Sequence, residues 1–177
     1  MAKAKEGDTL LTISALGLRV YIGFVALAIA VIGGGMVVML VAPPADIAGQ
    51  LASAPPAIRP LALACAAIIA VILVLGILFA VQLVRIIGTV KNGDPFEPAN
   101  ADRLWRMGWL TVAAHAAAIP AGAIGVWIKS VSGEAGKTLD VEFNLGSGGV
   151  LLILTLFILA RVFRHGAVMR EDLEGTV

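Results

Sequence analysis

Four apolar runs, each close to the length of a membrane crossing, constrain this chain more than any other feature. They cover residues 20–42, 61–84, 107–128 and about 145–161, the last ending at Arg161. A helix rises about 1.5 Å per residue, so about 20 residues span the ~30 Å hydrocarbon core of a bilayer. An apolar fraction of 59% exceeds the roughly 45–50% of soluble domains. We therefore predict an all-α integral membrane protein, a single domain over residues 1–177 that forms a four-transmembrane-helix bundle in the lipid bilayer.

Two local signals refine these helices. The apolar pattern continues upstream of the first run, which predicts a helix start near Asp8 or Thr9 as N-cap. Pro120 lies inside the third run and predicts a kink without a break, because neighbouring helices can satisfy the freed carbonyl. Trp109 and Trp127 stand near opposite ends of that run, where the two interfacial aromatic belts lie.

Basic residues distribute unevenly between the two sides. Only Arg59, Lys129 and Lys137 of the thirteen Lys and Arg residues fall in the loops that follow the first and third runs. The others belong to the N-terminal segment, the loop at 85–106 and the tail at 162–177 with its flanking Arg161. The positive-inside rule then predicts that both termini and the middle loop are cytoplasmic. The formal net charge of +1 gives no reason to expect direct nucleic acid binding.

The segment between the third and fourth runs alternates apolar and polar residues. Leu139, Val141 and Phe143 take turns with Asp140, Glu142 and Asn144, which is the period of a half-buried strand. A small extracytoplasmic β-hairpin and an irregular amphipathic loop both fit this pattern.

Nothing in the sequence forms a catalytic or metal-binding constellation. Cys65 is the only cysteine, and no nucleophile stands beside a base at a workable spacing. Metal binding would need several His, Cys or carboxylate ligands together. We therefore expect no enzymatic activity, no metal and no cofactor.

Polar groups inside the membrane are functional candidates, and His115 with Thr111 four residues earlier is the candidate pair here. The pair could bind a ligand, or His115 could be a neutral side chain hydrogen-bonded to a neighbouring helix. The small residues Ala117, Ala121 and Gly125 recur every four positions, which suits close helix packing within one chain or in a homo-oligomer.

The middle loop and the tail carry the most patterned cytoplasmic residues. Asn92-Gly93 and Asp94-Pro95 predict a tight turn, and Asn100 is suited to be the N-cap of the following helix. Phe96 either anchors this turn to the helices and headgroups or belongs to a docking surface for a cytoplasmic partner. The candidate docking surface comprises Asn92, Gly93, Asp94, Pro95, Phe96, Asn100, Arg103, Arg164, Arg170 and Asp172.

The same two segments resemble a known family. The run from Lys91 to Phe96, followed by Asn100, Arg103 and Leu104, and the tail from Arg170 to Val177 are similar to the bacterial membrane family called domain of unknown function 2975. This resemblance implies a four-helix protein of the bacterial inner membrane without known enzymatic activity. Members are often encoded beside a small helix-turn-helix regulator, which implies a membrane component that binds or sequesters that regulator. The alternative is a small transporter or channel subunit acting as a homo-oligomer.

Overall fold

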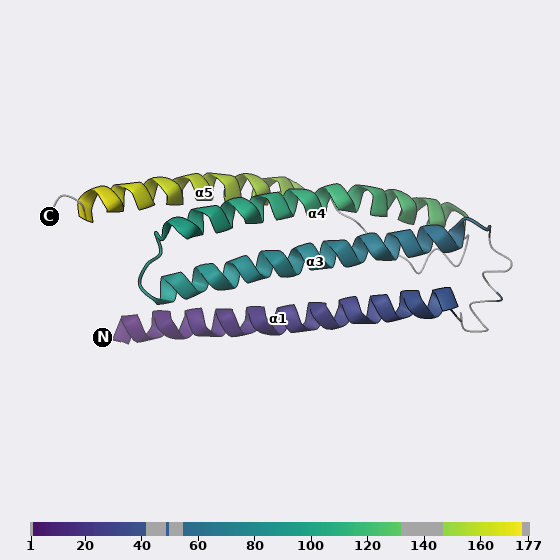
Figure 1. Ribbon diagram of the computed structural model, residues 1–177, viewed down its shortest axis with the longest axis horizontal. Helices are drawn as coiled ribbons and strands as arrows, with labels where there is room; N and C mark the ends of the chain where they lie inside the picture. Colours follow the sequence, from purple (N-terminus) through teal and green to yellow (C-terminus); the bar gives the residue numbers. More distant parts are fainter. Residues whose placement is uncertain (1, 42–48, 50–54, 132–146, 175–177) are drawn as a thin grey trace.

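Four long helices make up the computed structural model, which describes residues 2–41, 49, 55–131 and 147–174 (Figure 1). They are α1 (Ala2–Val41), α3 (Ile58–Lys91), α4 (Pro98–Val131) and α5 (Ser147–Glu174). Each contains a segment long and apolar enough to cross a membrane, and the described residues contain no strand. The prediction of an all-α protein with four such helices is confirmed. The predicted hairpin or loop between the third and fourth runs falls on residues 132–146, outside the described residues.

The helices extend past the apolar runs that they contain. α1 begins at Ala2, so the N-cap predicted near Asp8 or Thr9 is wrong. Ala, Lys and Glu at positions 2–6 are strong helix formers, and they carry the helix beyond the apolar run. α4 continues without interruption through Pro120, as predicted.

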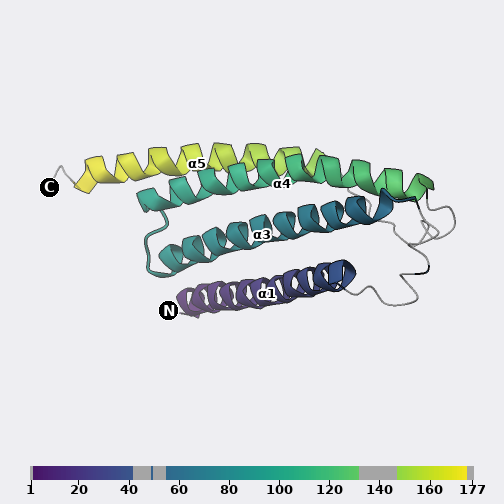
Figure 2. The same ribbon diagram turned by 45° about the vertical axis from the view of Figure 1, so that its right-hand side comes forward.

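The helices lie side by side in chain order. α3 packs against α1 on one side and α4 on the other, and α4 packs against α5 (Figures 1 and 2). α1 has extensive contacts with α3 alone, so the array is an open row and not a closed ring. Val25 is accordingly the one buried apolar residue of α1 among its described side chains. Lipid is the natural cover for the remaining apolar surface.

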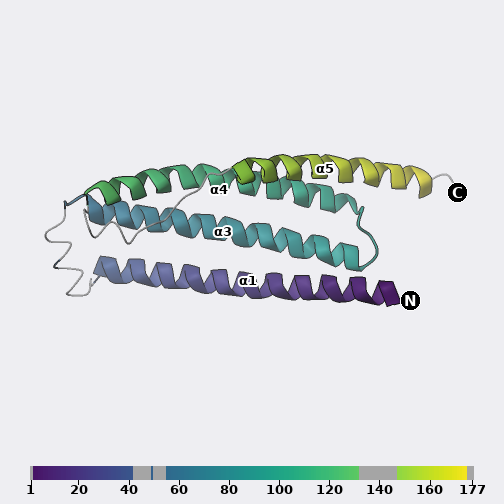
Figure 3. The ribbon, with the colours of Figure 1, turned by 180° about the vertical axis from the view of Figure 1, so that it is seen from behind.

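Both described chain ends lie at one end of this row. The start of α1, the turn joining α3 to α4 and the end of α5 share that end, which we call the turn end (Figures 1 and 3). The opposite end, where α3 begins, is called the Arg59 end.

α5 is displaced toward the turn end. Its first residues lie level with the middle of α4, where a Cβ added to Gly149 would meet the His115 ring. α3, α4 and α5 therefore pack together at the turn end. Six of the seven buried residues of α4 fall between Asn100 and Thr111. The core there consists of Leu104, Met107, Leu156 and Ala160, with Phe79, Leu83, Ile86 and Phe163 packed around them.

Candidate functional site

Backbone hydrogen bonds close the turn after α3. The Asp94 N–H donates to the Thr89 carbonyl at 3.0 Å, and the Gly93 N–H donates to the Val90 carbonyl at 3.1 Å. This pair of bonds is the Schellman motif, which requires a left-handed residue directly after the C-cap. Gly93 supplies it with a φ of 83°, next to the C-cap Asn92. The tight turn predicted at Asn92-Gly93 is present.

α4 begins three residues earlier than predicted. Its first helical residue is Pro98, and the Asn100 N–H already donates to the Glu97 carbonyl at 2.8 Å. Asn100 is thus inside the first turn, and the prediction that it is the N-cap is wrong. Proline is favoured at the first helical position because its φ is preset and its missing N–H would have no partner there. Glu97-Pro98 was the sequence signal for this boundary.

Asn100 instead holds the turn together from inside. Its side chain is 0% exposed. Its Nδ2 donates to Thr89 Oγ1 at 2.7 Å and to the Pro95 carbonyl at 3.0 Å. Arg103 Nη1 donates to Asn100 Oδ1 at 2.6 Å and lies 3.8 Å from Glu97 Oε2. The side chains of Asn100 and Arg103 therefore form hydrogen bonds within the turn. They stabilise the backbone that carries the outer residues of the candidate surface.

Phe96 joins the turn to α5. Its ring centroid lies 5.5 Å from that of Phe163. A Cβ added to Gly166 would fall 2.8 Å from Phe96 Cδ1, so the ring rests on the bare backbone of α5. Phe96 is nevertheless 42% exposed. The anchoring contact is therefore made by one side of the ring, while the other side faces outward.

Ion pairs reinforce the same junction. Arg170 Nη1 pairs with Asp94 Oδ1, and Arg164 Nη2 lies 3.0 Å from Asp102 Oδ1. The basic residues of α5 thus meet acidic residues of the turn and of α4. Asp172 lies exposed two residues beyond Arg170. We use the name turn–tail surface for Asp94, Phe96, Asp102, Arg164 and Arg170.

The intramembrane polar residues bond within α4. Thr111 is buried and its Oγ1 donates to the Met107 carbonyl at 2.9 Å. His115 Nδ1 lies 2.8 Å from the Thr111 carbonyl, which can only accept, so Nδ1 carries a proton. Nε2 faces Gly149, where an added Cβ would lie 1.9 Å away. The imidazole therefore occupies the space that a side chain at position 149 would need.

The small residues of the predicted stripe have different surroundings. Ala121 is fully buried, and Cys65 Sγ of α3 lies 3.8 Å from its carbonyl oxygen. Ala117 is half-buried, whereas Gly125 is exposed and has nothing within 4 Å of an added Cβ. The close approach of α3 and α4 thus occurs at Ala121, and Gly125 lies outside it.

The structure gives two polar residues, Gln82 and Arg59, surroundings that the sequence did not predict. Gln82 Oε1 is buried without a hydrogen-bond partner in the described part of the chain. Arg59 Nη2 donates to the carbonyls of Met39 at 2.6 Å and Leu40 at 3.2 Å. It thereby satisfies carbonyl groups at the C-terminus of α1 that have no partner within the helix. Among the described residues, no three His, Cys, Asp or Glu side chains gather to hold a metal ion.

The four helices define a multi-pass membrane protein. The family described as "Protein of unknown function (DUF2975)" matches residues 46–177, and the chain belongs to this family. The resemblance seen in the turn and tail is thus confirmed, and α1 precedes the matched residues. No curated protein and no solved structure matches the chain significantly.

Proposed function

We propose that this protein is a non-enzymatic regulatory component of the bacterial inner membrane, and that it binds a small cytosolic helix-turn-helix regulator through its turn–tail surface. The proposal places the turn end in the cytoplasm. It is supported by the excess of Lys and Arg in the N-terminal segment, middle loop and tail, and by the position of these segments at one end of the row.

The observation that carries the proposal is the assembly of the turn and α5 into one surface. Residues about 70 positions apart are held together by the Phe96–Phe163 contact and the Asp94–Arg170 pair. Asn100 and the Schellman turn preorganise the loop, so binding would require little additional ordering. Aromatic and Arg side chains are enriched at protein–protein interfaces, and this surface presents Phe96 together with Arg164 and Arg170.

The end of α5 offers further contact area for a partner. Val168 and Met169 are exposed apolar residues between Arg164 and Arg170, beyond the boundary set by Arg161. Glu171 and Asp172 follow as exposed carboxylates. These acidic groups suit the basic face with which a DNA-binding regulator contacts phosphates. Binding at this surface would therefore compete with DNA and sequester the regulator.

Membrane recruitment of the small helix-turn-helix regulator that the proposal invokes tests it. The two proteins are co-produced, and the fraction of regulator that sediments with membranes is measured for the wild type and two variants. Met169→Asp adds a charge beside the turn–tail surface, and Ser14→Asp adds the same charge at the same end on α1, where both positions are exposed. We expect at least about a tenfold loss of binding for Met169→Asp, equal to about 1.4 kcal/mol, and none for Ser14→Asp. Equal recruitment by all three proteins would refute the proposal.

The alternative, a homo-oligomeric transporter or channel subunit, has weaker support. Thr111 and His115 direct their hydrogen bonds to carbonyls of their own helix, and the His115 ring packs against α5. Neither residue is available in this arrangement to line a pathway between copies.

A further inference from the structure

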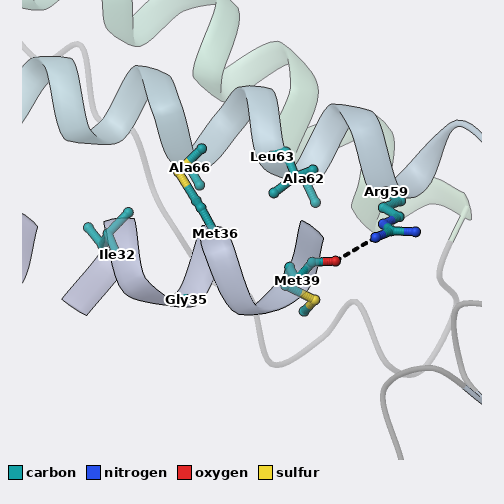
Figure 4. Close-up of a pocket in the computed structure, with 8 residues that line it drawn as sticks. All are labelled: Ile32, Gly35, Met36, Met39, Arg59, Ala62, Leu63 and Ala66. Carbon is teal, nitrogen blue, oxygen red and sulfur yellow. Dashed lines mark hydrogen bonds between the residues drawn. The ribbon is translucent and has the colours of Figure 1, made fainter. Parts of the chain in front are cut away.

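α1 and α3 form the walls of a partly open apolar cavity of about 340 Å³ toward the Arg59 end of the row (Figure 4). This volume falls in the range of about 300–1,000 Å³ that is usual for ligand pockets. The walls are almost entirely apolar, and a single charged group lies at one end. The lining includes Gly35, Met36 and Met39 of α1 and Arg59, Ala62 and Ala66 of α3.

The cavity exists because small residues leave space between the two helices. Gly35 has nothing within 4 Å of an added Cβ, and Ala62 and Ala66 contribute only methyl groups from α3. Apolar cavities of this kind do not hold ordered water, because water needs polar partners. The natural occupant is therefore apolar, and within a bilayer the most abundant apolar group is an acyl chain.

Arg59 gives the cavity a charge preference. It precedes the apolar run that begins at residue 61, so it lies at the level of the lipid headgroups. Its Nη2 is held by the Met39 and Leu40 carbonyls, which fixes the guanidinium beside the cavity. Among the described residues, no carboxylate is paired with Arg59. Guanidinium groups bind phosphate oxygens through strong, directional hydrogen bonds.

We propose that this cavity is a lipid-binding site that takes one acyl chain of an anionic phospholipid, with the phosphate of that lipid on Arg59. The acyl chain lies between α1 and α3 along Gly35 and Ala66, and the negative headgroup complements the guanidinium. This site is separate from the turn–tail surface, and it does not depend on the function proposed for that surface.

Native mass spectrometry of the full-length protein in detergent tests the site. The protein is mixed with phosphatidylglycerol or with phosphatidylcholine of the same acyl chains, and bound lipid is counted. We expect one phosphatidylglycerol to bind at least about tenfold more tightly than phosphatidylcholine. Gly35→Leu fills the cavity and should abolish this binding. Gly34→Leu is the matched control, since Gly34 is equally free of neighbours but does not line the cavity.

Two further variants keep the test decisive. Ala62→Leu fills the cavity from α3 and replaces Gly35→Leu if that variant does not fold, as judged by circular dichroism and size-exclusion chromatography. Arg59→Gln should lower phosphatidylglycerol binding to the level of phosphatidylcholine. Equal binding by the Gly35→Leu and Gly34→Leu proteins, or an unchanged lipid preference in Arg59→Gln, would overturn the proposal. A dimer that Gly35→Leu dissociates would also overturn it, because the occupant would then be a second copy of the chain.

Discussion

The two ends of the helix row differ in how closely their helices pack. At the turn end α3, α4 and α5 pack together, and Asn100, Leu104 and Met107 of α4 are buried. Toward the Arg59 end, Ala121 is the one buried residue of α4, and α1 and α3 leave a cavity. The displacement of α5 toward the turn end explains the difference, because the second half of α4 has α3 as its one described helical neighbour. The turn end is thus organised by contacts between α3, α4 and α5, whereas the described helices bury less of their surface toward the Arg59 end.

Asn100→Ala should produce the largest loss of stability at the turn end. The substitution removes hydrogen bonds to Thr89 and Pro95 and leaves Arg103 without its acceptor in a half-buried position. We expect the free energy of unfolding to fall by about 2–3 kcal/mol, as measured by denaturant titration in detergent micelles. Asn92→Ala, at the exposed C-cap of α3, should change it by less than about 0.5 kcal/mol. Similar losses in both variants would mean that burial of Asn100 does not organise this end.

Gly149→Ala probes the place where α5 first meets α4. The new methyl group would overlap His115 Nε2, so the imidazole or α5 must move. Overpacking of this kind costs about 1–3 kcal/mol. Gly148→Ala is the matched control, because its methyl group would meet nothing within 4 Å. Adding His115→Ala to Gly149→Ala should restore part of the lost stability, and a strictly additive double variant would show that the two residues are not in contact.

Gly166→Ala should loosen the turn from α5 while leaving the Arg59 end unchanged. An added Cβ would lie 2.8 Å from Phe96 Cδ1, so the ring must shift away. We expect a loss of about 1 kcal/mol, and faster amide hydrogen exchange over residues 92–97 than in the wild type. Exchange in α1 between residues 28 and 39 should stay the same. Gly88→Ala, also near the turn end but free of neighbours, provides the control. Faster exchange at both ends would show that they are a single cooperative unit.

Much of the fold was predictable because the bilayer imposes simple rules. In lipid every backbone polar group must be satisfied internally, so four long apolar runs lead directly to four helices. The lateral order of these helices was not predictable. The first two runs are apolar all round, so their sequences do not indicate which face meets a neighbour. The displacement of α5 likewise arises from contacts such as Gly149 with His115, which join distant parts of the chain.

The candidate site likewise contains one feature that was predictable from the sequence and others that were not. The turn at Asn92-Gly93 was predictable because the left-handed conformation of Gly93 is a local requirement. The role of Asn100 was not, since its burial depends on how α4 packs against the end of α3. Arg59 appeared in the sequence as an isolated charge in a loop, and its significance emerged once the C-terminus of α1 lay beside it. The left-handed turn was thus predictable from local sequence, whereas the contacts between helices were not.

Arg164→Ala should have the smallest effect, and it separates stability from binding at the turn–tail surface. The Arg164–Asp102 pair joins side chains that are 61% and 64% exposed, so water and salt screen their attraction. Pairs of this kind contribute about 0–1 kcal/mol, and we expect unfolding to change by no more than that, with any difference vanishing at high salt. Recruitment of the regulator should nevertheless weaken if Arg164 belongs to the binding surface, and Arg161→Ala, at the neighbouring membrane boundary, serves as the control. A large loss of stability would show that the pair holds α5 in place, whereas unchanged stability and recruitment would exclude Arg164 from the binding surface.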